Sequence, residues 1–504
     1  MTSSDKPPAT LDPADWDTLR ALAHRMVDDA LDRLRDIGTE PAWRAMPADT
    51  RAALSSDVPH HPTGAEAAYQ DFLTHVRPYA LRQIHPRWWG WVNGGGTPVG
   101  MLGDLLTASL NVNAGGFEEA ASYVEDQLIG WLGDLLDFRA PGVLVSGGSV
   151  ANLVALAAAR EAHAGGAAAA DGIRGLPQLT VYASTETHSS VHKAAATLGL
   201  GRTAVRKVPV DADFSIQPDV LERMIAADRA AGARPICVVA NAGTVNTGAF
   251  DDLEALADLC QREALWLHVD GAFGALAHLV PELRHLTRGM ARADSLAFDL
   301  HKWLHAPVGA GCILIRDRAA QRSAFASGAA YLAPFTRGPA SGGHVFGGDG
   351  PELTRRFRGL STWFALKALG ADAHAAAIAA DVAHARRLAE RVDAHPDLER
   401  LAPVPLNIVC FRYTPSSRVP APASGAASIG AAPAEPDDPR SLNALNRELL
   451  MRLQERGLAV PSSTVLNGRF ALRASFTNHR TTAADVDALV AAVVAIGNEL
   501  ARER

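Results

Sequence analysis

The residues best suited to chemistry follow two apolar runs in the middle of the chain, both predicted to be strands. Asp270 comes directly after one run, and the next run leads into Asp299 and Lys302. Because the carboxyl ends of strands in an open α/β sheet face the ligand crevice, we expect Asp270 and Lys302 to reach one cavity. A desolvated lysine can form a Schiff base, and a carboxylate can keep a heterocyclic nitrogen protonated. The alternative is a buried ion pair between Asp270 and an arginine, with Lys302 solvated.

A glycine pair marks a second candidate site. Ser146, Gly147, Gly148 and Ser149 follow a predicted strand and open a helix predicted over 150–164. Such a turn aims backbone N–H groups and a helix N-terminus at one point, which suits a phosphate. A glycine pair after a strand is more often only a tight turn, so this motif needs support from its neighbours.

Two further polar residues follow strands of the same region. His188 comes after the run 179–183, and Thr244 comes after the run 236–240. A single histidine in a loop is usually a surface or hydrogen-bonding residue. Taken together, however, four successive strand ends supply a phosphate corner, a polar platform, an acid and a lysine at one edge of the predicted sheet.

These segments resemble the group II pyridoxal-phosphate decarboxylases, the family of aromatic-L-amino-acid, histidine and glutamate decarboxylases. The resemblance runs from about His85 to Gly370. It is carried by five motifs in order: Ser-Gly-Gly-Ser at 146, Thr-His-Ser-Ser-Val at 187, Ala-Gly-Thr at 242, His-Val-Asp-Gly-Ala at 268 and Asp-Leu-His-Lys-Trp at 299.

The resemblance implies a cofactor and its ligands. It implies that Lys302 binds pyridoxal 5'-phosphate as a Schiff base, and that ionised Asp270 keeps the pyridine nitrogen protonated so that the ring can absorb the charge left by carbon dioxide. Asp299 stands where aromatic-type members often have Asn, which leaves its phosphate contact open. The remaining implied contacts are His188 on one ring face, Ala272 on the other, Gly148 and Ser149 at the phosphate, and Thr244 and His301 beside the ring.

Three tryptophans and a glycine run precede this region. Trp88 and Trp89 are predicted to be core aromatics, whereas Trp91 and Asn93 resemble the family's substrate-pocket segment. A pocket walled by Trp91 suits an aromatic or apolar side chain better than a carboxylate. The leading prediction is therefore decarboxylation of an L-amino acid, with an aromatic side chain favoured, to the amine and carbon dioxide.

A glycine-flanked loop leaves the product open. In aromatic-type decarboxylases a mobile loop carries a tyrosine that protonates the carbanion, and counting back from Arg355 without gaps places Phe346 at that position. Phe346 has no proton to give, so either Tyr331 or His344 is the donor, or the carbanion meets oxygen and an aldehyde is formed. The alternatives to amine formation are thus an aldehyde synthase and a catalytically silent cofactor-binding protein.

The elements that must position these residues alternate between short β-rich runs and helices, which predicts a mostly parallel sheet covered on both faces. The resemblance implies the fold type I architecture, with an N-terminal arm (1–105), a large seven-stranded α/β domain (106–370) and a small C-terminal α+β domain (371–504). A disordered insert is predicted near 415–439. An N-terminal helix is predicted from Asp12, and the C-terminal helix from Thr482. The seven predicted strands are Gly142–Val145, Leu179–Ala183, Ala204–Val210, Ile236–Ala240, Trp266–Val269, Ser295–Phe298 and Gly311–Ile315.

Composition is that of an ordinary globular enzyme. The 504 residues are 48% hydrophobic and 20% charged, with a formal net charge of −7, which points to neither nucleic acid nor a membrane surface. Four scattered cysteines and an N-terminus (Met1–Thr10) without an apolar stretch predict buried thiols in a cytoplasmic protein. The resemblance implies a homodimer with sites at the interface.

Overall fold

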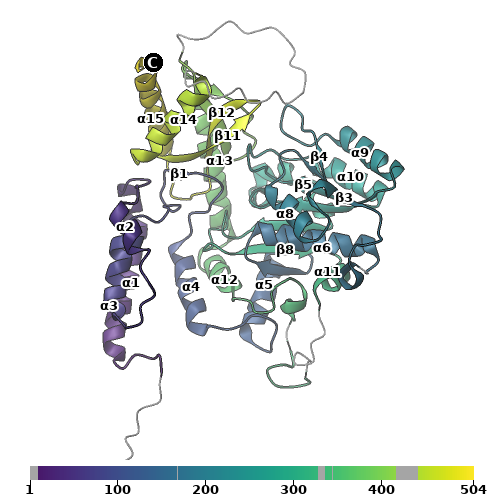
Figure 1. Cartoon of the computed structure of the whole chain (residues 1–504), viewed down its shortest axis with the longest axis horizontal. Coiled ribbons are helices and arrows are strands. Elements are labelled where there is room, and N and C mark those ends of the chain that lie inside the picture. The colour runs from purple at the N-terminus through teal and green to yellow at the C-terminus, as the bar shows by residue number, and fades with distance from the viewer. Residues whose placement is uncertain (1–9, 167, 327–334, 343, 416–440, 504) are drawn as a thin grey trace, which may run out of the picture.

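The computed structural model describes residues 10–166, 168–326, 335–342, 344–415 and 441–503 (Figure 1). The predicted disordered insert and Tyr331 lie outside these residues, apart from Pro415 at the insert's edge. The four cysteines are free and buried, as predicted. Among the described residues no helix combines the length and the apolar character needed to cross a membrane.

The middle of the chain forms a seven-stranded sheet, in which β8 is antiparallel to both neighbours and the other neighbouring pairs are parallel. This confirms the predicted mostly parallel sheet and the approximate place of every predicted strand. In spatial order the strands are β2 (Gly142–Val145), β8 (Gly311–Ile315), β7 (Ser295–Asp299), β6 (Trp266–Asp270), β5 (Arg234–Asn241), β3 (Leu179–Ser184) and β4 (Val205–Val208).

Helices pack around this sheet. The alanine-rich α6 crosses it, and wholly buried Ala155, Ala158 and Ala159 let the helix backbone approach β5, β6, β7 and β8 closely. α6 also contacts α8 and α11, so it is packed against helices as well as against the sheet. The helices of this part are α4 (Pro98–Leu110), α5 (Ala120–Leu135), α6 (Gly148–Ala164), α7 (Ala168–Asp171), α8 (Ser189–Thr197), α9 (Pro218–Ala230), α10 (Leu253–Glu263), α11 (Arg318–Phe325) and α12 (Gly359–Leu369).

A second, five-stranded sheet has the order β1 (Trp88–Trp89), β11 (Val460–Leu466), β12 (Arg469–Ser475), β10 (Ile408–Tyr413) and β9 (Leu398–Arg400). Its edge strand β1 comes from the N-terminal part of the chain and pairs in parallel with β11. Buried Trp89 packs in this sheet's own core, as predicted for a core aromatic. The helices here are α13 (Ala371–Asp393), α14 (Leu442–Glu455) and α15 (Ala483–Arg502), and α15 begins with the predicted Thr482 and Asp485 capping box.

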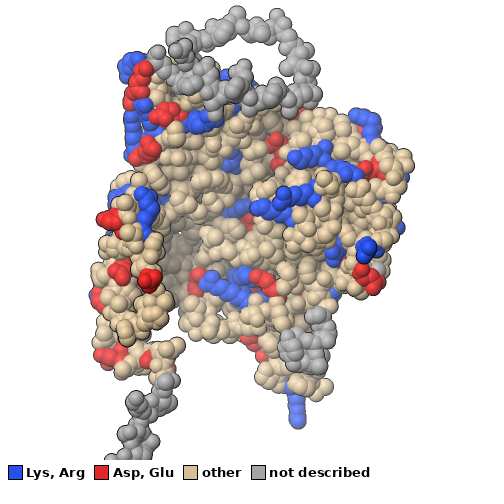
Figure 2. All heavy atoms as spheres, in the orientation of Figure 1, with Lys and Arg blue, Asp and Glu red and all other residues tan. Residues whose placement is uncertain are grey.

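The N-terminal helices α1 (Trp16–Asp36), α2 (Ala48–Ala53) and α3 (Ala65–Asp71) form a column beside the rest of the chain (Figure 1). The prediction that the first helix starts at Asp12 was wrong by a few residues. Asp15 is the N-cap, because its carboxylate accepts the backbone N–H groups of Asp17 and Thr18. On the face that Figure 2 shows, basic side chains gather near the upper end of this column and acidic side chains are scattered along it.

Candidate active site

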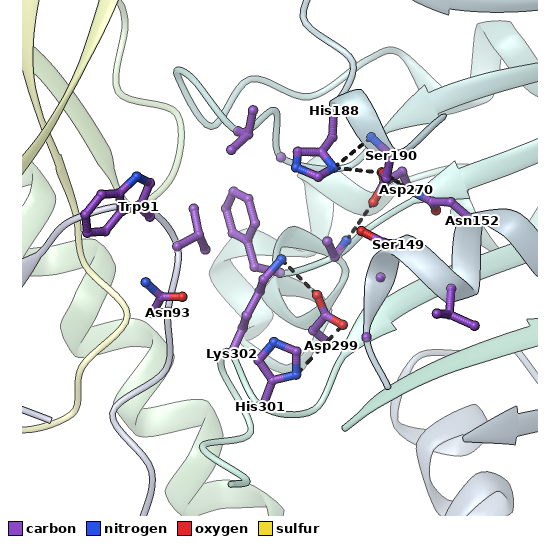
Figure 3. A pocket seen from close by; sticks show the side chains of 18 of the residues that line it. Trp91, Asn93, Ser149, Asn152, His188, Ser190, Asp270, Asp299, His301 and Lys302 are labelled. Atoms are coloured by element: carbon purple, nitrogen blue, oxygen red, sulfur yellow. Dashed lines mark hydrogen bonds and ion pairs between the residues drawn. The ribbon is translucent and has the colours of Figure 1, made fainter. Parts of the chain in front are cut away.

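A cavity of about 390 Å³ lies at the carboxyl ends of β2, β3, β5, β6 and β7 (Figure 3). The candidate residues were predicted to lie here because the carboxyl ends of parallel strands meet at one edge of a sheet. The structure brings together ten of the predicted residues in the cavity lining: Trp91, Asn93, Gly148, Ser149, His188, Asp270, Ala272, Asp299, His301 and Lys302.

Lys302 projects into this cavity from the segment after β7. Its Nζ lies 2.8 Å from Asp299 Oδ2, and the two side chains are only 17% and 4% exposed. A solvated surface lysine is therefore excluded. In the described part of the chain no arginine pairs with Asp270, so the alternative of a structural ion pair at that residue is wrong as well.

The N-terminus of α6 opens on the same cavity. The N–H groups of Gly148 and Ser149 have no acceptor within the described chain, because they belong to the first turn of the helix. A Cβ added to Gly148 would lie 3.1 Å from Asp299 Oδ2, so any larger residue here would require the Asp299 side chain to shift. This corner presents donors and a partial positive charge, which is what a phosphate requires.

Asp270 ends β6 and is buried. Its carboxylate accepts hydrogen bonds from the side chain of Asn152 (2.8 Å) and from the backbone N–H of Ala272 (3.2 Å). Asn152, on α6, is a site residue that the sequence analysis missed. The available clue was a single amide within the apolar stretch 150–159 of this helix, four residues after Gly148.

His188 is the N-cap of α8. Its Nδ1 accepts the backbone N–H of Ser190 (3.3 Å) and lies 2.8 Å from Ser190 Oγ. Partial burial lowers the pKa of His188, so the imidazole is neutral at neutral pH. Figure 3 shows the ring at one wall of the cavity, across from Lys302.

Trp91 and Asn93 line the opposite side of the cavity. Trp91 has a left-handed backbone (φ 56°), and its carbonyl accepts a hydrogen bond from Arg473. The segment then passes so close to the Lys302 loop that a Cβ on Gly94 would lie 2.2 Å from the carbonyl oxygens of His301 and Lys302. Glycine at 94 is therefore what lets the tryptophan segment meet the lysine loop.

One predicted cofactor contact is corrected. Thr244 is buried, but its hydroxyl is bonded to Thr247 Oγ1 (3.0 Å) and to the N–H of Ala249 (3.1 Å) within its own turn. Its side chain does not line the cavity, where its neighbours Gly243 and Val245 do. A threonine after a strand can serve the turn itself, and here it does.

His344, a candidate proton donor, and Phe346, which counting placed at the position of the family's tyrosine, also lie outside this cavity. The Phe346 ring is fully buried and stacks on His344 with ring centroids 4.1 Å apart. His344 is hydrogen-bonded to both Asp126 and Asp349. Burial alone would lower the pKa of His344, but these two carboxylates together raise it. His344 and Phe346 therefore anchor a loop, and neither side chain reaches the cavity that contains Lys302 in the same chain.

Comparison with known proteins decides the family. Residues 47–414 match the model of the pyridoxal-dependent decarboxylase conserved domain. The chain belongs to this decarboxylase family. It is 32% identical over 491 residues to an aromatic-L-amino-acid decarboxylase of Bacillus atrophaeus, covering 96% of each chain. It is also similar to the Oryza sativa TDC structure with PLP and tryptamine, with TM-score 0.87 and 27% identity over 97% of this chain and 100% of that one.

A second solved structure is similarly close in fold. The mouse CSAD structure has TM-score 0.86 and 28% identity, covering 96% of the decarboxylase and 99% of that chain. These likenesses confirm the fold type I architecture. They also establish the decarboxylase as an enzyme that uses pyridoxal 5'-phosphate to release carbon dioxide from an amino acid.

The residues of the cavity fit this cofactor. A lysine amine, a buried carboxylate without a cationic partner and two free amide donors at a helix N-terminus match an aldehyde, a pyridine nitrogen and a phosphate. One feature fits less well. Asp299 adds a buried carboxylate to the phosphate corner, and its Oδ1 has no hydrogen-bond partner within the described chain.

Proposed function

We propose that this decarboxylase acts on aromatic L-amino acids and releases the corresponding amine. The observation that carries the proposal is the cavity lining: among the described residues Lys302 is joined by no arginine, and Trp91, Val92 and Phe273 provide apolar surface. A side-chain carboxylate or sulfinate has no free cation to bind there, whereas an aromatic ring has apolar surface to cover. The likeness to the Bacillus aromatic-L-amino-acid decarboxylase supports the same substrate class.

We assign the cofactor contacts to the cavity residues. When bound, pyridoxal phosphate supplies an aldehyde for the substrate amine and a ring that absorbs the charge left by carbon dioxide. Lys302 provides the amine that holds the cofactor, and Asp270 holds a proton at the pyridine nitrogen. Gly148 and Ser149 bind the phosphate through their N–H groups. His188 and Ala272 enclose the ring, with His301 beside it and Trp91 and Asn93 on the substrate side.

The substrate assignment is tested by measuring carbon dioxide release from L-tryptophan, L-phenylalanine, L-tyrosine, L-cysteine sulfinate and L-glutamate. We expect kcat/KM for at least one aromatic substrate to exceed that for either acidic substrate by about 100-fold or more, since an unpaired buried anion is costly. We also expect Trp91→Ala to raise KM for the aromatic substrate by about tenfold. A preference for cysteine sulfinate, the substrate named for a human relative 32% identical over 79% of this chain, would refute the assignment.

Asp299→Asn is expected to tighten cofactor binding. Asp299 faces the phosphate corner with a 4% exposed carboxylate, and its one close cation is the Lys302 amine that the cofactor recruits. Removing this negative charge relieves repulsion of the phosphate, which we expect to lower the dissociation constant of pyridoxal phosphate about tenfold. Titration of apoprotein followed by absorbance measures it. Binding weakened in Asp299→Asn would mean that the carboxylate helps to hold the cofactor.

We propose amine over aldehyde as the product, although a phenylacetaldehyde synthase of Arabidopsis thaliana is 27% identical over 92% of each chain. Phe346 is buried outside the cavity of its own chain. Its lack of a hydroxyl therefore does not affect proton transfer, and hence the product, in that cavity. Wild type is expected to release amine without oxygen uptake, and Phe346→Tyr to lower the melting temperature without changing the product. Ammonia and peroxide from wild type, suppressed in Phe346→Tyr, would establish the aldehyde route instead.

We further propose a cytoplasmic homodimer with the domain division at 105 and 370. The column of α1 to α3 supports the dimer, since it exposes Trp16 (58%) and Met26 (43%). Leu105, Leu106 and Leu110 on α4 are likewise exposed. Exposed apolar side chains of this kind are expected where a single chain presents the surface that contacts its partner. The presence of Lys302, Asp270 and His188 in one cavity argues against a catalytically silent protein.

A further inference from the structure

A chain of buried polar side chains lies beneath the cavity and connects Asp270 with His188. Asn152 is its centre: it is 1% exposed and contacts Asp270, Ser190 and His268. His268 continues the chain to Ser295 and Trp266, and Ser190 continues it to His188 (Figure 3 shows the part from Asn152 to His188). Buried polar groups must be satisfied, so the direction of every hydrogen bond here can be worked out.

The Asn152 amide has one possible orientation. Its nitrogen lies 2.8 Å from the Asp270 carboxylate and 2.9 Å from Ser190 Oγ, and an ionised carboxylate can only accept. The amide NH₂ therefore donates to both groups. The Asn152 oxygen then faces His268 Nε2 at 2.9 Å and must receive a proton from it.

His268 is consequently fixed as one tautomer. Burial lowers the pKa of His268 to about 4, so the ring is neutral and its single proton is on Nε2. Its Nδ1 accepts from Ser295 Oγ at 2.9 Å, and Ser295 in turn accepts the indole N–H of Trp266 at 2.8 Å. Since the Asn152 oxygen can only accept, the proton of neutral His268 is held on Nε2, and Nδ1 is left to accept from Ser295.

The other branch reaches the cavity. Ser190 Oγ accepts from Asn152, so its own hydroxyl proton is free for His188 Nδ1 at 2.8 Å. The backbone N–H of Ser190 also points at His188 Nδ1. With two donors on Nδ1, neutral His188 carries its proton on Nε2, the nitrogen that has no partner within the described chain.

We propose that Asn152 and His268 are positioning residues of this enzyme, which hold the Asp270 carboxylate in place and fix His188 as the tautomer that presents an Nε2 proton to the cavity. The inference rests on the proposed roles of Asp270 and His188. The inference explains how Asp270 and His188 are coupled. The Asn152 amide orients the Asp270 carboxylate directly and, through Ser190, the His188 imidazole.

The tautomers can be measured without cofactor or turnover. In ¹⁵N-histidine-labelled apoprotein at about pH 8, where histidines are neutral, NMR distinguishes the protonated ring nitrogen from the unprotonated one. The signals are assigned with His188→Gln and His268→Gln. We expect both residues to be protonated on Nε2. In Ser190→Ala, His188 is expected to become a mixture of tautomers while His268 stays unchanged.

The Asp270 branch is tested by Asn152→Asp, which replaces the two N–H donors by a second carboxylate of the same shape. Two adjacent carboxylates share a proton, so Asp270 loses charge at neutral pH and regains it as the pH rises. We expect kcat to fall at least about tenfold with KM within about twofold, and kcat then to increase with pH where wild type does not. Asn446→Asp, which alters an equally buried amide in the C-terminal unit, is the matched control and should retain the wild-type pH profile.

Two results overturn the proposal. One is a wild-type His188 protonated on Nδ1, or a His188 tautomer that Ser190→Ala leaves unchanged. The other is a wild-type pH profile in Asn152→Asp. The NMR measurement needs neither cofactor nor substrate, so failure of the proposed function is recognised separately by an absence of carbon dioxide release from every amino acid tested.

Discussion

Lys302→Ala is expected to abolish decarboxylation and the visible absorbance of the bound cofactor. The chain contains five lysines, and Lys302 is the one that lines the cavity among the described residues. With no other amine in reach of the cofactor aldehyde, we expect kcat to fall by at least about a thousandfold. Carbon dioxide release and the absorbance spectrum of the purified protein check this result.

The control for this variant is Lys207→Ala, on the exposed side of the edge strand β4. It removes the same charge and should retain the spectrum and activity of wild type. If Lys302→Ala keeps a visible band that borohydride reduction traps on another side chain, the assignment of Lys302 is wrong.

Asp270→Asn is expected to keep the cofactor but lose most of the activity. Lys302 and the N–H groups of Gly148 and Ser149 are untouched by this change, so binding persists. A neutral amide cannot keep the pyridine nitrogen protonated, and we expect a loss of about 3 to 4 kcal/mol in transition-state stabilisation, or about 10²–10³ in kcat. Steady-state kinetics at saturating cofactor measures the loss.

Asp228→Asn provides a matched control. This carboxylate accepts hydrogen bonds from Tyr182 and Arg206, outside the cavity, so its loss should lower stability and leave kcat near wild type. A decrease in kcat of less than about tenfold for Asp270→Asn would show that another group stabilises the ring nitrogen.

The sequence predicted the cavity well because its ligands follow strands. Asp270 and Lys302 each come directly after an apolar run, and the geometry of a parallel sheet brings such ends together whatever the loops do between them. Asn152 escaped prediction because it lies inside a helix, where position relative to the sheet depends on how α6 packs. Its partners, Ser190 and His268, are far from it in sequence, so only the folded chain shows that they meet.

Two side chains named from the sequence lie outside the cavity of this chain, because each has local contacts of its own. Thr244 bonds its own turn, a choice that depends on the hydroxyl's immediate neighbours and leaves no mark on hydrophobic periodicity. Phe346 was placed by counting through glycine-rich sequence, and the structure instead stacks it on His344, within 4.8 Å of the Arg355 guanidinium. Counting along the sequence does not reveal these contacts, because the backbone path of such loops is not set by a repeating pattern.

The tryptophan segment is attached to both sheets at once. Trp88 and Trp89 are hydrogen-bonded into the C-terminal sheet beside Val460 and Pro461, whereas Gly94 abuts the carbonyls of the Lys302 loop. A change in the relative position of the two sheets must therefore alter the backbone conformation of residues 90–93, which include Trp91. The Trp91 side of the cavity thus depends on both sheets, whereas Asp270 ends one strand, and Lys302 follows another, of the seven-stranded sheet alone. If Trp91 contacts the substrate as proposed, we expect substitutions in the C-terminal sheet, far from Lys302, to change substrate preference without changing the chemistry at Lys302.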